Sequence, residues 1–256
     1  MNELSLEGME GEPIPYLLHS DWMVTCILFL CILVVSIVFS KNKKHLYQGI
    51  KNFTQNRERN SMFDEITASD ARHTVLLVFH ACLMLAFCAY YYIVNSCPLL
   101  FGQFTHGLVL FFLVLAISFC TFLKWATYQV VNWVFFQKER NILWITAFVN
   151  LLCCLGIVLL PIVLLIVYFN VSAQIAYILM GSLLIFMKMA LFWKCFSNFF
   201  EKIHGFLHLI LYFCALEILT DLILWTGMEL LNNNLILNFN SLENKESSRL
   251  SAKAIV

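Results

Sequence analysis

A few ionisable residues lie inside the apolar segments of this chain, and they are the candidates for binding or proton-transfer chemistry. Glu217 lies within HGFLHLILYFCALEIL, residues 204–219, at the start of the last strongly apolar segment, and Asp221 follows one helical turn later. An ionisable group at membrane depth costs roughly 2.5–3.5 kcal/mol on insertion scales, so it is paired or functional by default. Glu217 is therefore the first candidate for a functional side chain.

Lys188, in the preceding apolar segment, is the candidate partner of Glu217. At the helical rise, Glu217 lies roughly 16 Å from the cytoplasmic end of its span and Lys188 roughly 8 Å from the same side. An ion pair between the two would hold the register of the last two spans, whereas a proton or cation step at Glu217 is the functional alternative. We favour the ion pair, because a proton relay through the membrane needs a chain of ionisable groups and Glu217 has no further acids in line with it. Asp221, nearer the outer boundary, is expected to be hydrated.

Histidines suggest a second kind of chemistry, the binding of a metal or haem iron. His204 and His208 are one turn apart, and His80 lies near the cytoplasmic end of an earlier span. Three imidazoles of this kind could ligate a metal. However, both His204 and His208 lie nearly opposite Glu217 on a helical wheel, and all three histidines are within two turns of the interface. The sequence therefore predicts no metal site and no cofactor.

Signatures of soluble enzymes are missing from the sequence. It contains no phosphate-binding loop, no His-Glu-x-x-His zinc helix, no Cys-x-x-Cys and no glycine-rich dinucleotide turn. We assign no catalytic residue and favour a non-enzymatic protein, although membrane enzymes can use scattered polar residues. A formal net charge of zero argues against nucleic acid as a partner.

The elements that position these residues follow from composition. Hydrophobic residues make up 61% of the chain and charged ones 12%, with a mean hydropathy of +0.80. Since a helix of about 20 apolar residues crosses a bilayer, we predict an all-α polytopic transmembrane bundle with interfacial amphipathic helices. The six predicted spans cover about 22–39, 74–94, 107–123, 143–169, 174–193 and 206–225.

The distribution of charge predicts the orientation of this 22–239 membrane domain. Residues 1–21 contain five acids and no Lys or Arg, whereas the loop 41–73 is rich in both. By the positive-inside rule this loop is cytoplasmic, which leaves the acidic, flexible N-terminus outside. With six spans, the polar tail 240–256, which we predict to be disordered, is outside as well.

The cytoplasmic loop has two halves of different character. Apolar residues recur at helical spacing among basic ones in its first half: Leu46, Tyr47, Ile50 and Phe53. This pattern indicates a short helix on the anionic inner leaflet of the bilayer. The second half carries Arg57 and Arg59 among charges of both signs, which favours a solvated face and leaves a docking surface for a protein partner as the alternative.

The segment 124–136 follows the third span without a break in apolarity. Lys124 divides it from the span, and Trp125 and Trp133 have the character of interface residues. We expect an amphipathic continuation that bends at the cytoplasmic interface. Tryptophans at the predicted boundaries form an aromatic belt: Trp22, Trp125, Trp144, Trp193 and Trp225.

Three phrases of the sequence, NRERNSMFDE, KWATYQVVNWVFF and HGFLHLILYFCALEIL, resemble a multi-pass inner-membrane family of Bacteroidetes known only as a domain of unknown function, family number 4271. The resemblance covers about Trp22 to Phe239. It implies a Gram-negative inner membrane, so that the outside is the periplasm, and it implies no activity. Thr220 stands where that family often has a proline. The resemblance directs attention to four residues: Arg57, Arg59, Tyr212 and Glu217.

Two functions from different classes follow. The first is a non-enzymatic integral subunit or assembly factor of a cell-envelope complex, with the bilayer and a protein partner at loop 41–73. The alternative is a small transporter or lipid-handling membrane enzyme that uses Glu217 and Lys188.

Overall fold

The computed structural model describes residues 18–54, 68–96, 105–135, 138–169 and 171–199, together with 222, 226, 227, 229 and 230. Every regular element in these ranges is helical, so the prediction of an all-α protein is confirmed there. The elements are a 3-10 helix η1 (Leu18–Ser20) and the helices α1 (Trp22–Thr54), α2 (Ala68–Ser96), α3 (His106–Phe135), α4 (Lys138–Tyr168) and α5 (Ala173–Phe199).

Five helices in the described residues are long and apolar enough to cross a membrane. Their apolar parts have a mean hydropathy of 2.0 or more and cover Trp22–Lys41, Ala71–Asn95, His106–Val130, Trp144–Tyr168 and Ala173–Lys194. Twenty or more such residues match the thickness of a hydrocarbon core. These segments correspond to the first five predicted spans, and the sixth, 206–225, lies outside the described residues except for residue 222.

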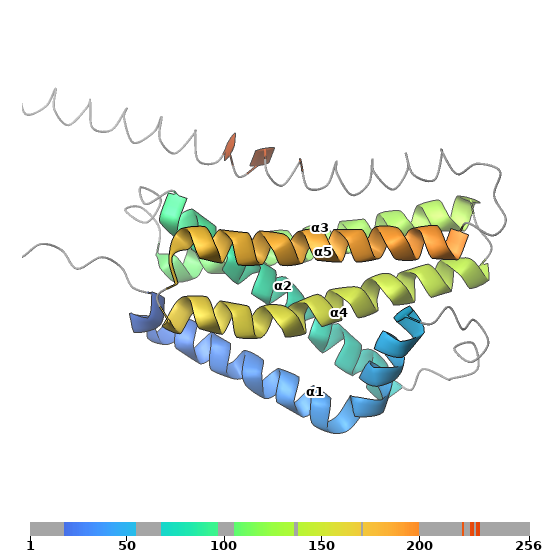
Figure 1. Cartoon of the computed structure of the whole chain (residues 1–256), viewed down its shortest axis with the longest axis horizontal. Coiled ribbons are helices and arrows are strands. Elements are labelled where there is room, and N and C mark those ends of the chain that lie inside the picture. Colours follow the sequence, from blue (N-terminus) through green and yellow to red (C-terminus); the bar gives the residue numbers. More distant parts are fainter. Residues whose placement is uncertain are drawn as a thin grey trace, which may run out of the picture.

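The helices run up and down the bundle. Figure 1 shows the start of α1, the end of α2, the start of α3, the end of α4 and the start of α5 together at the left. We call this the tyrosine end, because it carries Tyr90, Tyr91, Tyr92, Tyr168 and Tyr177. Between α3 and α4 and between α4 and α5 the connections are only a few residues long, so the next helix must start at the end of the bundle where the previous one stopped.

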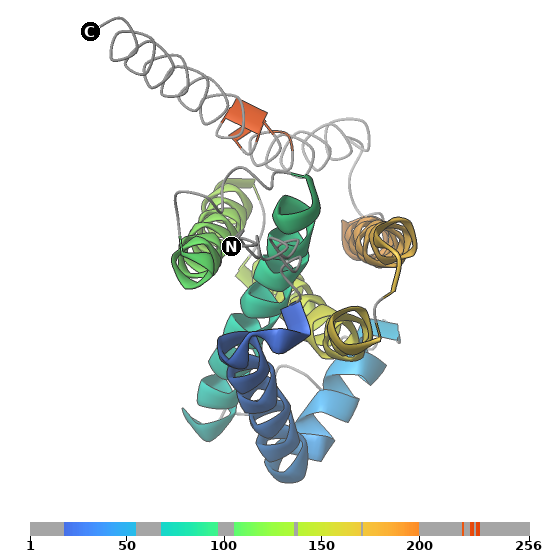
Figure 2. The same cartoon turned by 90° about the vertical axis from the view of Figure 1, so that its left-hand side faces the viewer.

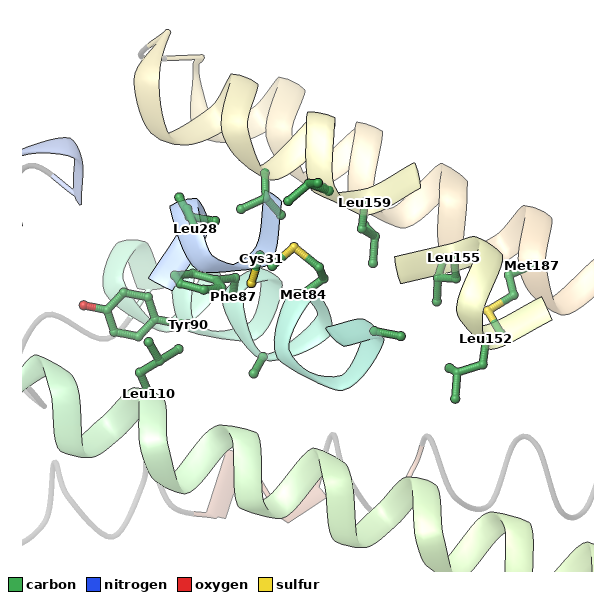
Figure 3. Close-up of a cluster of buried hydrophobic side chains, with 14 of the residues drawn as sticks. Leu28, Cys31, Met84, Phe87, Tyr90, Leu110, Leu152, Leu155, Leu159 and Met187 are labelled. Carbon is green, nitrogen blue, oxygen red and sulfur yellow. The ribbon is translucent and has the colours of Figure 1, made fainter. Parts of the chain in front are cut away.

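The core lies around α2 and α4, which pack on each other more extensively than any other pair of helices. In the end-on view of Figure 2, α3 and α5 lie on different sides of this central pair. Figure 3 shows how Leu28 and Cys31 of α1 meet Met84 and Phe87 of α2 in one apolar cluster. The outward sides of α3 and α5 carry large exposed apolar residues, as expected of surfaces that face lipid.

A close contact of small residues brings α2 and α4 together. A Cβ atom added to Gly156 would come within 2.7 Å of both Cα and Cβ of Ala81. Only glycine permits such an approach of two helix backbones, and small residues play the same part where membrane helices pack closely. This contact sets the distance between the two central helices.

Three details differ from the sequence prediction. First, α1 does not end with its apolar part but continues to Thr54, and Figure 1 shows it sharply bent beyond that part. Second, residues 124–135 continue α3 as one helix, and its membrane-length part reaches Val130 rather than Leu123. Third, Trp144 begins the membrane-length part of α4, near the predicted boundary, but its side chain is only 2% exposed and packs edge-to-face on Tyr128, so its ring is buried among the helices.

Candidate functional site

Of the residues that the sequence singled out, the structure describes two, Lys188, which is partly buried on α5, and the histidine His80 on α2. The remaining ones lie outside the described residues: Arg57, Arg59, His204, His208, Tyr212, Glu217 and Asp221. The predicted pair of Lys188 with Glu217, and the metal alternative at His204 and His208, therefore stay predictions. The polar groups that the structure does place belong to three levels of the bundle.

At the tyrosine end, a hydrogen bond joins α2 to α3. The Tyr90 hydroxyl lies 2.9 Å from Nδ1 of His106, and Tyr90 itself is 1% exposed. The two rings meet edge-to-face. His106 is the first residue of α3, so this bond fixes where α3 begins relative to the last turns of α2.

Asp21, at the start of α1, lies close to the Tyr90–His106 hydrogen bond. Its Oδ1 accepts a hydrogen bond of 3.0 Å from the backbone N–H of Met23, which caps the start of α1. The same carboxylate acts electrostatically on the ring of His106. A carboxylate, an imidazole and a phenol thus lie at the meeting point of α1, α2 and α3. The sequence analysis missed this cluster, since Asp21 and His106 are 85 positions apart and only the fold unites them.

Two further polar contacts close the tyrosine end. The Tyr168 hydroxyl donates to Oγ1 of Thr25 at 3.2 Å, joining α4 to α1, and the Tyr91 hydroxyl donates to the carbonyl of Val171 at 3.5 Å. Tyr91 and Tyr92 both pack on Tyr177 of α5. Tyrosine contacts therefore involve all five long helices at this end. Tyrosine suits such a position, because its ring packs on apolar side chains while its hydroxyl forms a hydrogen bond.

Deep in the bundle, His80 is the one buried histidine among the described residues. It is 3% exposed, in the middle stretch of the membrane-length part of α2. The peptide group of Gly156 on α4 faces its ring. Within the described part of the chain, neither Nδ1 nor Nε2 meets the geometry of a hydrogen bond. The sequence placed His80 close to the interface; the structure places it inside the core.

A second polar pair lies between α2 and α3. The Cys82 thiol lies 3.6 Å from Oγ1 of Thr121, which itself donates to the carbonyl of Ile117 at 2.8 Å. Cys153 is buried on α4 in a small cluster with Val38 and Leu77. Cys82 and Cys153 are free and buried among apolar neighbours, where a thiol packs as a small apolar residue.

The end opposite the tyrosine end has a polar link of its own between two helices. Nδ2 of Asn141 donates to Oε1 of Gln129 at 3.0 Å, joining α4 to α3. Tyr128 packs between Trp144 and Phe148 of α4 in edge-to-face contacts. Lys194 is 5% exposed near the end of α5. A lysine at this depth extends its apolar stem along its neighbours toward the interface.

No three His, Cys, Asp or Glu side chains come together as a possible metal site in the described ranges. The five membrane-length parts contain no Asp or Glu. The described side chains thus build hydrogen-bonded links between helices, and the chemistry that the sequence suggested depends on Glu217 in the segment beyond α5.

Within the described residues the architecture is that of a helical bundle of five membrane-length apolar helices, in which α1, α3 and α5 lie around the central pair α2 and α4. Residues 24–228 match the family described as Domain of unknown function (DUF4271), well over half of the chain, so the chain belongs to that family. No curated protein and no solved structure matches the chain.

Proposed function

We propose that this protein is a non-enzymatic integral subunit or assembly factor of a cell-envelope complex in the inner membrane of a Gram-negative bacterium. The helical extension of α1 carries the proposal. With 33 residues, α1 is about 50 Å long, whereas a hydrocarbon core is about 30 Å thick. The 13 residues that follow the membrane-length part, 42–54, add about 20 Å of helix along the chain, and Figure 1 shows that this piece turns away from the direction of the membrane-length part.

The part of α1 beyond its membrane-length part, residues 42–54, is rich in basic residues; we call it the arm. Residues 41–54 hold Lys41, Lys43, Lys44 and Lys51, and Arg57 and Arg59 follow in the sequence. Basic residues that flank a span favour the cytoplasmic side and anionic lipid. We propose that the arm positions the charged segment 55–67 against a cytoplasmic part of the complex, and that the helices α3 and α5 face lipid.

Co-purification tests the proposal directly. The chain, expressed at its native level, is extracted in mild detergent and the proteins that remain bound are identified by mass spectrometry. We expect an envelope protein in fixed stoichiometry with the chain. The charge reversal of Arg57 and Arg59 to Glu should release it, whereas the same reversal at Arg249 and Lys253 in the tail is the matched control. Equal recovery from both double variants would refute the role of the arm.

The alternative, a small transporter or lipid-handling enzyme, depends on Glu217. No carboxylate occurs in the five membrane-length parts that the structure describes, so Glu217 would have to act with Lys188 and nearby polar groups. Recovery of the chain with lipid alone would favour this alternative. A Glu217→Gln variant that accumulates normally but loses the phenotype of the parent would then identify the carboxylate as functional.

A further inference from the structure

The helix α1 changes direction where its membrane-length part ends. That part covers Trp22–Lys41, and the same helix continues through the arm, residues 42–54. In Figure 1, where α4 and α5 run horizontally, the arm runs across their direction, and the end-on view of Figure 2 shows the arm lengthwise. Because the membrane-length helices cross the bilayer, a helix that runs across them lies along the surface of the membrane.

The arm has two faces of different chemistry. Its apolar residues recur at the spacing of one side of a helix: Leu46, Tyr47, Ile50 and Phe53. At 3.6 residues per turn, the opposite side carries polar residues: Lys44, Gln48, Lys51 and Asn52. A helix of this length is marginal in water by itself, so its apolar face needs an apolar surface on which to lie.

Charge indicates which surface fits the arm. Residues 41–54 contain four lysines and no acid, and the side chain of Lys41, immediately before the arm, is exposed. A basic helix with one apolar face is typical of helices that lie in a bilayer surface, with apolar side chains at the acyl boundary and lysines at anionic headgroups. Each lysine near such a surface favours attachment about fivefold. The bilayer surface is also the nearest one, because α1 leaves the hydrocarbon where the arm begins.

We propose that the arm is an in-plane anchor that binds anionic phospholipid, with the face of Leu46, Ile50 and Phe53 in the bilayer surface. A straight continuation of α1 would carry these side chains into water, whereas the bend places them along the leaflet. The inference rests on the proposed function for the cytoplasmic orientation of the arm, and it deepens that function. An anchored arm holds the segment 55–67 at the membrane surface, where a membrane-bound partner can reach it.

Fluorescence quenching on the full-length protein in vesicles tests the anchor. A fluorescent amino acid replaces Ile50 on the apolar face or, as the matched control, Asn52 on the polar face. In vesicles of phosphatidylcholine mixed with phosphatidylglycerol, brominated acyl chains should quench the probe at position 50 and spare the probe at position 52. Iodide on both sides of the membrane should show the reverse order. Equal quenching at the two positions would overturn the anchor: iodide alone at both would place the arm in water, and neither agent at either would place it under a protein surface.

Replacement of Lys43, Lys44 and Lys51 with glutamine tests the lipid chemistry, with the probe kept at position 50. Loss of three lysines should lower the ratio of attached to detached arm roughly 100-fold on phosphatidylglycerol, about fivefold for each. Bromine quenching should then fall to the level of vesicles made of phosphatidylcholine alone. The control replaces the same number of basic residues in the tail with glutamine, Lys245, Arg249 and Lys253, and should leave the quenching unchanged. Unchanged quenching in the arm variant, or equal quenching of the parent with and without phosphatidylglycerol, would overturn the assignment of anionic lipid.

The anchor and the proposed complex fail separately in these experiments. Normal quenching without a co-purified protein would refute the complex and leave the anchor standing. A co-purified protein released by the Arg57 and Arg59 reversal, together with equal quenching at positions 50 and 52, would refute the anchor alone.

Discussion

Replacing Gly156 with alanine should force α2 and α4 apart. The new Cβ would lie 2.7 Å from Cα and Cβ of Ala81, whereas ordinary contact begins at 3.4 Å. The helices must therefore separate by about 0.7 Å, the difference between these two distances. The same displacement loosens the neighbouring core around Leu155 and Met84, which are almost fully buried.

Overpacking of a filled core costs about 1–3 kcal/mol, and alanine returns up to about 1 kcal/mol through its higher helix propensity. We expect Gly156→Ala to lower the free energy of unfolding by a net of about 1–2 kcal/mol. Reversible unfolding in mixed micelles with increasing SDS, followed by tryptophan fluorescence, measures this difference.

Gly181→Ala is the matched control. It also lies in the middle of a long apolar helix, but a Cβ there meets nothing within 4 Å, so its stability should equal or slightly exceed that of the parent. Ala81→Gly should not rescue Gly156→Ala, because the Cα of Ala81 is as near as its Cβ. Equal stability of the two alanine variants, or full rescue by Ala81→Gly, would refute the close backbone contact.

Further measurements address the tyrosine end and the segment beyond α5. Tyr90→Phe removes the hydrogen bond to His106 and should lower the free energy of unfolding by about 0.5–1.5 kcal/mol in the same SDS assay; Tyr168→Phe, whose bond is exposed, should cost less, and the reverse order would contradict the assigned burial. Alkaline phosphatase, which is active only outside the cytoplasm, should be inactive when fused after residue 200 and active when fused after residue 256; equal activity at both points would exclude a sixth span. Glu217→Gln should reduce the steady-state abundance of the protein in membranes if the carboxylate pairs within the bundle, and unchanged abundance with unchanged growth would rule out both roles for Glu217.

Much of the helical structure follows from the sequence because membrane helices obey a local rule. Each apolar run must satisfy its own backbone hydrogen bonds, so length and hydropathy predict a helix without knowledge of its neighbours. The membrane-length parts of the five helices begin and end within a few residues of the predicted spans, except in α3. There, Lys124 suggested an end at Leu123, but one lysine with a long apolar stem does not interrupt a helix.

The surroundings of the candidate functional residues are harder to predict, because the sequence gives only the type of each residue and its position along its span. Lys188 was placed on the correct helix, and its pairing with Glu217 stays a prediction. The position of His80 near the start of its predicted span indicates its depth, but it does not indicate that the side chain is buried among the helices. Burial depends on which side of α2 faces α1 and α4, and a helix that is apolar on all sides gives no periodic signal of that direction.

By itself, the sequence determined that this chain consists of long apolar helices, where most of them lie, and that basic residues gather after the first. Those properties depend on composition within one segment. Only the tertiary structure decided that α2 and α4 form the centre, that Asp21, Tyr90 and His106 meet at one end, and that His80 faces the proline-containing helix. The reason is physical: in a membrane nearly every side of a helix is apolar, so close packing of small residues and a few hydrogen bonds select the neighbours.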